Sequence, residues 1–67
     1  MTIKEKIEKF EWLNSGIKNL NGAYVKVLNV RVNKKKGEAI ANTILGWYDG
    51  DCQEHRYDNC VYPLKRL

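Results

Sequence analysis

Asp49 and Gly50 form the strongest hairpin signal in the chain, and they constrain its fold more than any other feature. Asp-Gly favours a tight two-residue turn because both central positions of that turn require positive φ. Before the turn, residues 38–48 alternate as a half-buried strand does, and residues 51–57 after it are a second strand-like segment. The stretch 44–64 also contains both cysteines, the single histidine and the single proline. We therefore expect an antiparallel β-structure centred on this turn.

A phase change interrupts the alternation in the preceding strand-like segment, residues 23–32. Val25 and Val27 fall on one face, whereas the apolar residues from Leu28 onward fall on the other. Such a strand is either buried on both sides or bent by a β-bulge, and we expect the bend. Residues 33–37 then form a hairpin loop in which Gly37 supplies positive φ.

Asp58 and Asn59 predict a further turn, because both residue types favour turns and tolerate left-handed backbone. Residues 60–62 would then form a short fourth strand. Pro63 ends that strand, since proline has no N–H to donate to a neighbouring strand. The expected β-region therefore has four to five short strands over residues 22–67.

An amphipathic helix is predicted at the N-terminal end, within residues 1–16. Thr2 and Glu5 have the spacing of a capping box, in which each side chain satisfies a backbone donor of the other residue. From Ile3 onward, the apolar side chains of Ile3, Ile7 and Phe10 share one face at 100° per residue. Three turns of helix should therefore end near Gly16.

The length of 67 residues allows one domain, with about 60% of the unfolded surface buried on folding. No apolar run approaches the roughly 18 residues of a membrane helix, and charge follows the initiating Met1 where a signal peptide would be apolar. We therefore expect a cytoplasmic protein without a membrane partner. Its two cysteines are too few for a disulfide scaffold and are expected to be free thiols.

One helix followed by short, bent antiparallel strands is the layout of an SH3-like barrel with an N-terminal extension. The chain resembles the Tudor, KOW and related small-barrel families in three segments, residues 22–27, 44–50 and 62–67. This resemblance implies a mostly-β fold in which a barrel of four to five strands follows one helix. It also implies a non-enzymatic module that binds its partner through the barrel rim.

Net charge is +4, which favours encounter with polyanions. Lysine and arginine side chains neutralise phosphate, and aromatic rings stack on unpaired bases. Lys26, Lys65 and Arg66 add to this positive charge. The residues expected to contact nucleic acid or another partner are Arg31, Lys34, Lys35, Lys36, Trp47, Tyr48, Arg56 and Tyr57. In a competing interpretation, the three consecutive lysines only form a solvated hairpin tip.

Trp12 supports an alternative function. It points away from Ile3 on the helical wheel, so it either folds back against the following loop or faces a partner. In the second case the protein would be an interaction or inhibitory factor, for example of phage type, that binds a host protein through its helix and a barrel edge. An uncovered strand edge would also allow a homo-oligomer.

Catalytic and metal chemistry have little support in the sequence. Cys52, His55 and Cys60 have the spacing C-x2-H-x4-C, but in a strand Cys52 and His55 would point to opposite faces. Cys60 beside Val61 is expected to be a core thiol. The resemblance to Tudor barrels also implies that an aromatic cage for a methylated cation is possible, against packing of the same rings in the core. The rings are Trp47, Tyr48, Tyr57 and Tyr62. We expect no enzyme activity, no cofactor and no metal.

Overall fold

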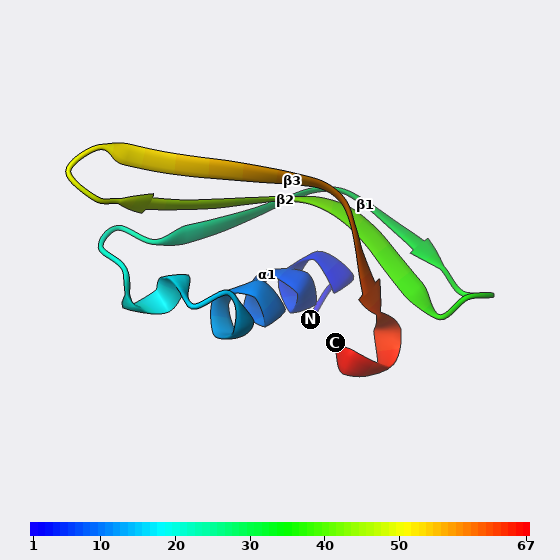
Figure 1. Ribbon diagram of the computed structural model, residues 1–67. Coiled ribbons are helices and arrows are strands. Elements are labelled where there is room, and N and C mark those ends of the chain that lie inside the picture. Colours follow the sequence, from blue (N-terminus) through cyan, green and yellow to red (C-terminus); the bar gives the residue numbers. More distant parts are fainter.

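The computed structural model describes all residues 1–67. Its elements are α1 (Ile3–Asn14), a 3-10 turn η1 (Ile17–Asn19), β1 (Tyr24–Asn33), β2 (Glu38–Tyr48), β3 (Cys52–Pro63) and a second 3-10 turn η2 (Leu64–Arg66). The molecule measures 44 × 18 × 16 Å along its principal axes. Figure 1 shows that α1 lies along one face of the sheet and that the two chain ends lie near each other.

The predicted helix start is confirmed. The Thr2 hydroxyl accepts a hydrogen bond from the Glu5 N–H at 3.2 Å, and the Glu5 carboxylate accepts one from the Thr2 N–H at 3.1 Å. These bonds to Thr2 lower the pKa of the Glu5 carboxyl below its ordinary value. The cap therefore stabilises the helix at a pH above that value and is lost as the pH falls through the lowered pKa. At the other end the chain leaves α1 through Gly16, whose φ is +83°.

The three strands form an antiparallel sheet in the order β1-β2-β3. β2 pairs with both neighbours, and the outer strands do not pair with each other. The prediction of an SH3-like barrel with four to five strands is therefore wrong. The sheet is open and has two free edges.

The turn predicted at Asp58 and Asn59 is instead a β-bulge inside β3. Tyr57 pairs with Thr43 and Cys60 pairs with Ala41, so β3 has one residue more than β2 over this interval. Asn59 takes a φ of +55°, which the extra residue of a bulge requires and asparagine tolerates. Residues 60–62 therefore continue β3, and no fourth strand exists to close a barrel.

A second bulge lies in β1 between Leu28 and Arg31, as the phase change of this segment predicted. Its residue Asn29 has a φ of +53°. The two bulges flank Asn42 of the central strand, whose side-chain oxygen accepts a hydrogen bond from the Asn59 N–H at 3.0 Å. Bulges bend and twist a strand locally. Figure 1 shows the sheet curving toward α1, so that the face away from the helix is convex.

The alternation of β2 defines two faces of the sheet. The helix-bearing face carries the buried side chains of β2, which are Ala39, Ala41, Thr43 and Leu45. The opposite face, called the open face here, carries Ile40, Asn42, Ile44, Gly46 and Tyr48. Cross-strand partners point to the same side of a sheet, so the register assigns each residue of β1 and β3 to one of these faces.

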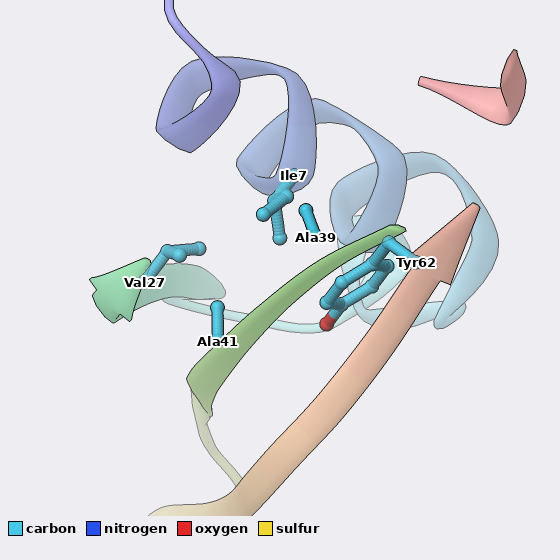
Figure 2. Packing of buried hydrophobic residues seen from close by; sticks show 5 residues of the cluster. All are labelled: Ile7, Val27, Ala39, Ala41 and Tyr62. Carbon is cyan, nitrogen blue, oxygen red and sulfur yellow. The ribbon is translucent and has the colours of Figure 1, made fainter. Parts of the chain in front are cut away.

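The core lies between α1 and the helix-bearing face. Ile7 of α1 is fully buried and packs with Val27, Ala39, Ala41 and Tyr62 (Figure 2). Phe10 extends this cluster by an edge-to-face contact with the Tyr62 ring, at 5.7 Å between centroids. The backbone of α1 lies closest to β1, and the Ile7 side chain fills the space over the small alanines of β2.

A buried hydrogen bond of 2.8 Å joins the hydroxyls of Thr43 and Tyr62 within this core. Replacing Tyr62 with Phe leaves the Thr43 hydroxyl, which is 1% exposed, without that partner. We expect Tyr62→Phe to lower the free energy of unfolding by about 1–3 kcal/mol. The double variant Thr43→Val with Tyr62→Phe should recover part of this loss, because neither group then lacks a partner. Urea unfolding of both variants measures the difference, and a double variant less stable than Tyr62→Phe would contradict it.

The left-handed backbone at Asn29 gives a second stability prediction. Asn29→Gly should leave the free energy of unfolding within about 0.5 kcal/mol of wild type, because glycine adopts positive φ freely. Asn29→Val should lower it by about 1–2 kcal/mol, because a β-branched side chain clashes in that conformation. Thermal and urea unfolding of the two variants test the bulge. Equal stability of the two would show that residue 29 is not held at positive φ.

Candidate functional site

The structure divides the predicted contact residues among three places. Arg31, Tyr48 and Arg56 lie on the open face, Trp47 and Tyr57 lie on the helix-bearing face, and Lys34, Lys35 and Lys36 lie in the β1–β2 loop. Tyr62 is in the core and only 4% exposed. The four rings considered for an aromatic cage therefore do not face one another. The basic and aromatic residues expected in one surface belong to different surfaces.

Trp47 and Tyr57 lie where the β2–β3 hairpin extends beyond α1. The Trp47 ring stacks on the His55 ring, with 4.9 Å between centroids and 16° between planes. Another part of Trp47 borders a hollow of about 450 Å³, whose lining also includes Leu20 and Asn21. Tyr57 lies opposite Thr43 and is 49% exposed. One face of the Trp47 ring is thus already occupied by His55.

The open face is built from rows of cross-strand partners, and no helix covers it (Figure 1). These rows are Tyr24, Gly46 and Glu54; Lys26, Ile44 and Arg56; Leu28 and Asn42; and Arg31, Ile40 and Val61. The outer strands supply the charged side chains, while the central strand supplies isoleucine, asparagine and glycine. Leu28 and Val61 are 39% and 53% exposed. The face therefore combines exposed apolar surface with cations from both edge strands.

Tyr24 holds a fixed position on this face. A Cβ atom placed on Gly46 would collide with the Tyr24 side chain, whose Cζ, Cε1 and Oη atoms would all lie at nearly the same distance from that Cβ. A point at equal distance from these three atoms lies above the plane of the ring. The flat side of the Tyr24 ring therefore covers Gly46. The Tyr24 hydroxyl donates a hydrogen bond to the Glu54 carboxylate on β3, which raises the pKa of the hydroxyl. The ring thus lies across the central strand, anchored at its far end.

Two further contacts order charged side chains at the bend of the open face. The Arg31 guanidinium of β1 donates to the Asn59 side-chain oxygen of β3 at 3.3 Å. On β3, Arg56 forms a 2.7 Å salt bridge with Asp58, and both side chains are more than half exposed. An exposed pair of this kind contributes less than about 1 kcal/mol to stability. Its effect is to hold the Arg56 guanidinium close to the sheet.

Most of the positive charge gathers around η2, at the end of the molecule where the β1–β2 loop lies. The Leu64 N–H donates to the Gly37 carbonyl at 2.8 Å, which holds η2 against that loop. Lys36 and Lys65 border one hollow there, and Lys6, Lys9 and Arg66 border a second one between α1 and η2. We call this region the basic end, and its cations are Lys6, Lys9, Lys34, Lys35, Lys36, Lys65 and Arg66. Glu38 is the one acidic side chain lining either hollow.

Sequence reasoning missed two parts of this arrangement. Lys6 and Lys9 were not among the expected contact residues, yet they border the hollow beside Arg66. Tyr24 was treated only as part of a strand. Gly46 indicates that another group packs on the strand there, because glycine inside a strand often marks the close approach of another group.

The cysteines and the histidine are separated as their strand positions predicted. Cys52 pairs with Tyr48 on the open face, whereas His55 pairs with Leu45 on the helix-bearing face. Cys60 packs against the core, and its thiol donates to the Tyr57 carbonyl at 3.4 Å. No group of three or more histidine, cysteine or acidic side chains is placed to hold a metal ion. α1, with 12 residues, is too short and too polar to cross a membrane.

Comparison with known proteins found no relative with which the open face or the basic end could be compared. No family model, no curated protein and no solved structure matches it.

Proposed function

We propose that this protein is a small binding module for nucleic acid, in which the basic end holds phosphate groups. One observation carries the proposal: η2 borders two hollows, in one of which Arg66 lies with Lys6 and Lys9 of α1, and in the other of which Lys65 lies with Lys36 of the β1–β2 loop. These segments are far apart in the sequence. A cluster assembled from three of them is a surface of the fold, whereas three lysines alone could be a solvated loop.

The cations of the basic end form no salt bridge, although the Arg66 guanidinium lies over the Phe10 ring, 5.9 Å from its centre. The one salt bridge in the structure joins Arg56 to Asp58, on the open face. Inside the loop, the Asn33 side chain accepts a hydrogen bond from the Lys36 N–H at 3.3 Å, and Gly37 takes a φ of +65°. Asn33 and Gly37 therefore fix the conformation of the loop, and the three lysine side chains extend from it. Binding of such a surface to a polyanion releases counterions and gains affinity at low salt.

The open face offers a continuation from the basic end along the sheet. Arg31 lies on this face nearer the β1–β2 loop, and five residues further along β1, about 17 Å away, Lys26 and Arg56 share one cross-strand row. Two carboxylates also lie there, but Glu54 accepts the Tyr24 hydroxyl and Asp58 is paired with Arg56. The three cations of the route exceed its two carboxylates by one charge. A nucleic acid held at the basic end would meet further cations on the sheet.

Removal of charge at the basic end should weaken binding in a salt-dependent way. Lys65→Gln should reduce the magnitude of the slope of log binding constant against log salt concentration by about 1, which is the effect of one lost phosphate contact. The triple change of Lys34, Lys35 and Lys36 to Gln should lower it further. Lys18→Gln removes the same single charge from η1, at the other end of α1, and should leave the slope unchanged. Fluorescence anisotropy with labelled oligonucleotides from about 50 to 300 mM salt measures these slopes.

Two outcomes would contradict the proposal. The first is an absence of binding to single-stranded and duplex DNA and RNA at about 50 mM salt. The second is an equal effect of Lys18→Gln and Lys65→Gln, which would mean that net charge alone drives the interaction. Urea unfolding of each variant controls for stability, since these exposed positions should change it by less than about 0.5 kcal/mol.

A second candidate function, binding of a protein partner through α1, is favoured by the exposed last turn of the helix. Trp12 is 37% exposed and Leu13 is 52% exposed, and neither belongs to the core cluster. Tryptophan at an accessible position is a frequent anchor of protein interfaces. In this second function, α1 contacts the partner protein and the sheet supports α1.

Trp12→Ala separates this function from nucleic-acid binding. The substitution should leave the fold intact and the affinity for oligonucleotides within about twofold of wild type, because Trp12 is not part of the basic end. A partner held through α1 should be lost by the variant. Nuclease-treated pull-downs with the wild-type protein and with Trp12→Ala measure this, and a partner retained equally by both would contradict a role for Trp12.

A further inference from the structure

The Tyr24 ring has the geometry of a stacking platform. Its inner side lies over Gly46, and its hydroxyl is bound to Glu54 across the sheet. A ring held at both ends loses little conformational freedom when a second ring stacks on it, so more of the stacking energy remains available for binding. Since the inner side of the ring lies against Gly46, its outer side faces away from the sheet, and Tyr24 belongs to the face that no helix covers.

Other aromatic rings of the protein are less suited to this role. Phe10 and Tyr62 pack against each other beside the core. Trp47, which stacks on His55, and Tyr57 lie on the helix-bearing face. Tyr48 is the exception, since it is 52% exposed and follows Gly46 by two residues on the open face. Tyr24, which is half-buried, and Tyr48 are therefore the aromatic residues of this face.

Cations stand next to the platform at the spacing that a nucleotide requires. The neighbouring row of the sheet, about 7 Å away, carries Lys26 on β1 and Arg56 on β3. The Lys26 ammonium lies over the Tyr24 ring, 5.5 Å from its centre, so it moves aside when a base stacks there. A lysine on a flexible stem can contact the phosphate of a nucleotide whose base stacks on the ring. Base and phosphate contacts are thus available together.

We propose that the Tyr24 ring stacks on an unpaired base, so that the nucleic acid bound by this protein is single-stranded. This inference rests on the nucleic-acid-binding function proposed above. In a duplex both sides of every internal base are covered by neighbouring bases, so a flat ring on a sheet surface cannot reach them. A single strand exposes its bases, and it can run from the basic end along the cations of the open face to Tyr24.

Binding of matched oligonucleotides tests the inference. The probes are a labelled single-stranded DNA of about 12 nucleotides, an RNA of the same sequence and the corresponding DNA duplex. Wild type should prefer the single strands. Tyr24→Leu should weaken single-strand binding by about 5- to 150-fold, which is the range for loss of one stacked base. It should leave the salt slope unchanged, unlike Lys65→Gln.

Two further variants separate stacking from a general loss of structure. Tyr24→Phe keeps the ring and removes the hydrogen bond to Glu54, so it should retain most of the affinity that Tyr24→Leu loses. Tyr57→Leu removes an equally large side chain from the helix-bearing face and should leave the affinity within about twofold of wild type. If Tyr24→Leu does not fold, NMR of the wild-type protein answers the question. Stacking should shift the Tyr24 ring protons on addition of the single strand, and the Tyr57 protons should stay unshifted.

The possible failures are distinguishable. Duplex binding as tight as single-strand binding, or unshifted Tyr24 ring protons in a formed complex, would overturn the stacking inference and leave nucleic-acid binding standing. Absence of binding to all three probes at about 50 mM salt would overturn both proposals.

Discussion

The packing of Ile7 against the alanines of β2 is the contact on which the rest of the structure depends. A three-stranded sheet of this size is marginal without a covering layer, because its apolar side chains have nothing to pack against. α1 supplies that layer, and its Ile7 side chain packs on Ala39 and Ala41 of the central strand. Since one short helix covers only one side, the same contact decides which face of the sheet is buried and which is left to solvent.

The two bulges then determine the shape of the exposed face. Asn29 and Asn59 each adopt a left-handed conformation, on opposite sides of Asn42, so both outer strands bend at the same level. The sheet curves around the helix, and η2 is brought back against the β1–β2 loop. The basic end is a product of this curvature, because a flat sheet would carry η2 away from α1. Backbone geometry and the distribution of charge are therefore linked.

Local elements were more predictable than their arrangement. The capping box, the helix start and the bend of β1 follow from short-range patterns that packing did not override. Asp58 and Asn59 show the limit: the tolerance of left-handed backbone that favours a turn also favours a bulge, and only pairing with β2 distinguishes the two. The binding residues had the same ambiguity. Trp47 and Tyr48 are adjacent, so they point to opposite faces, and which face is open depends on where α1 packs.

The bulges also limit how this chain can associate with copies of itself. An open sheet presents unpaired N–H and C=O groups along β1 and β3, and long straight edges of that kind recruit further strands. Here no edge is straight for long: regular pairing covers residues 24–28 and 31–33 in β1, and residues 52–57 and 60–63 in β3. A second copy that aligned with one part of an edge would lose register at the bulge. The asparagines that shape the convex face thus also protect a small open sheet from growing into a larger one.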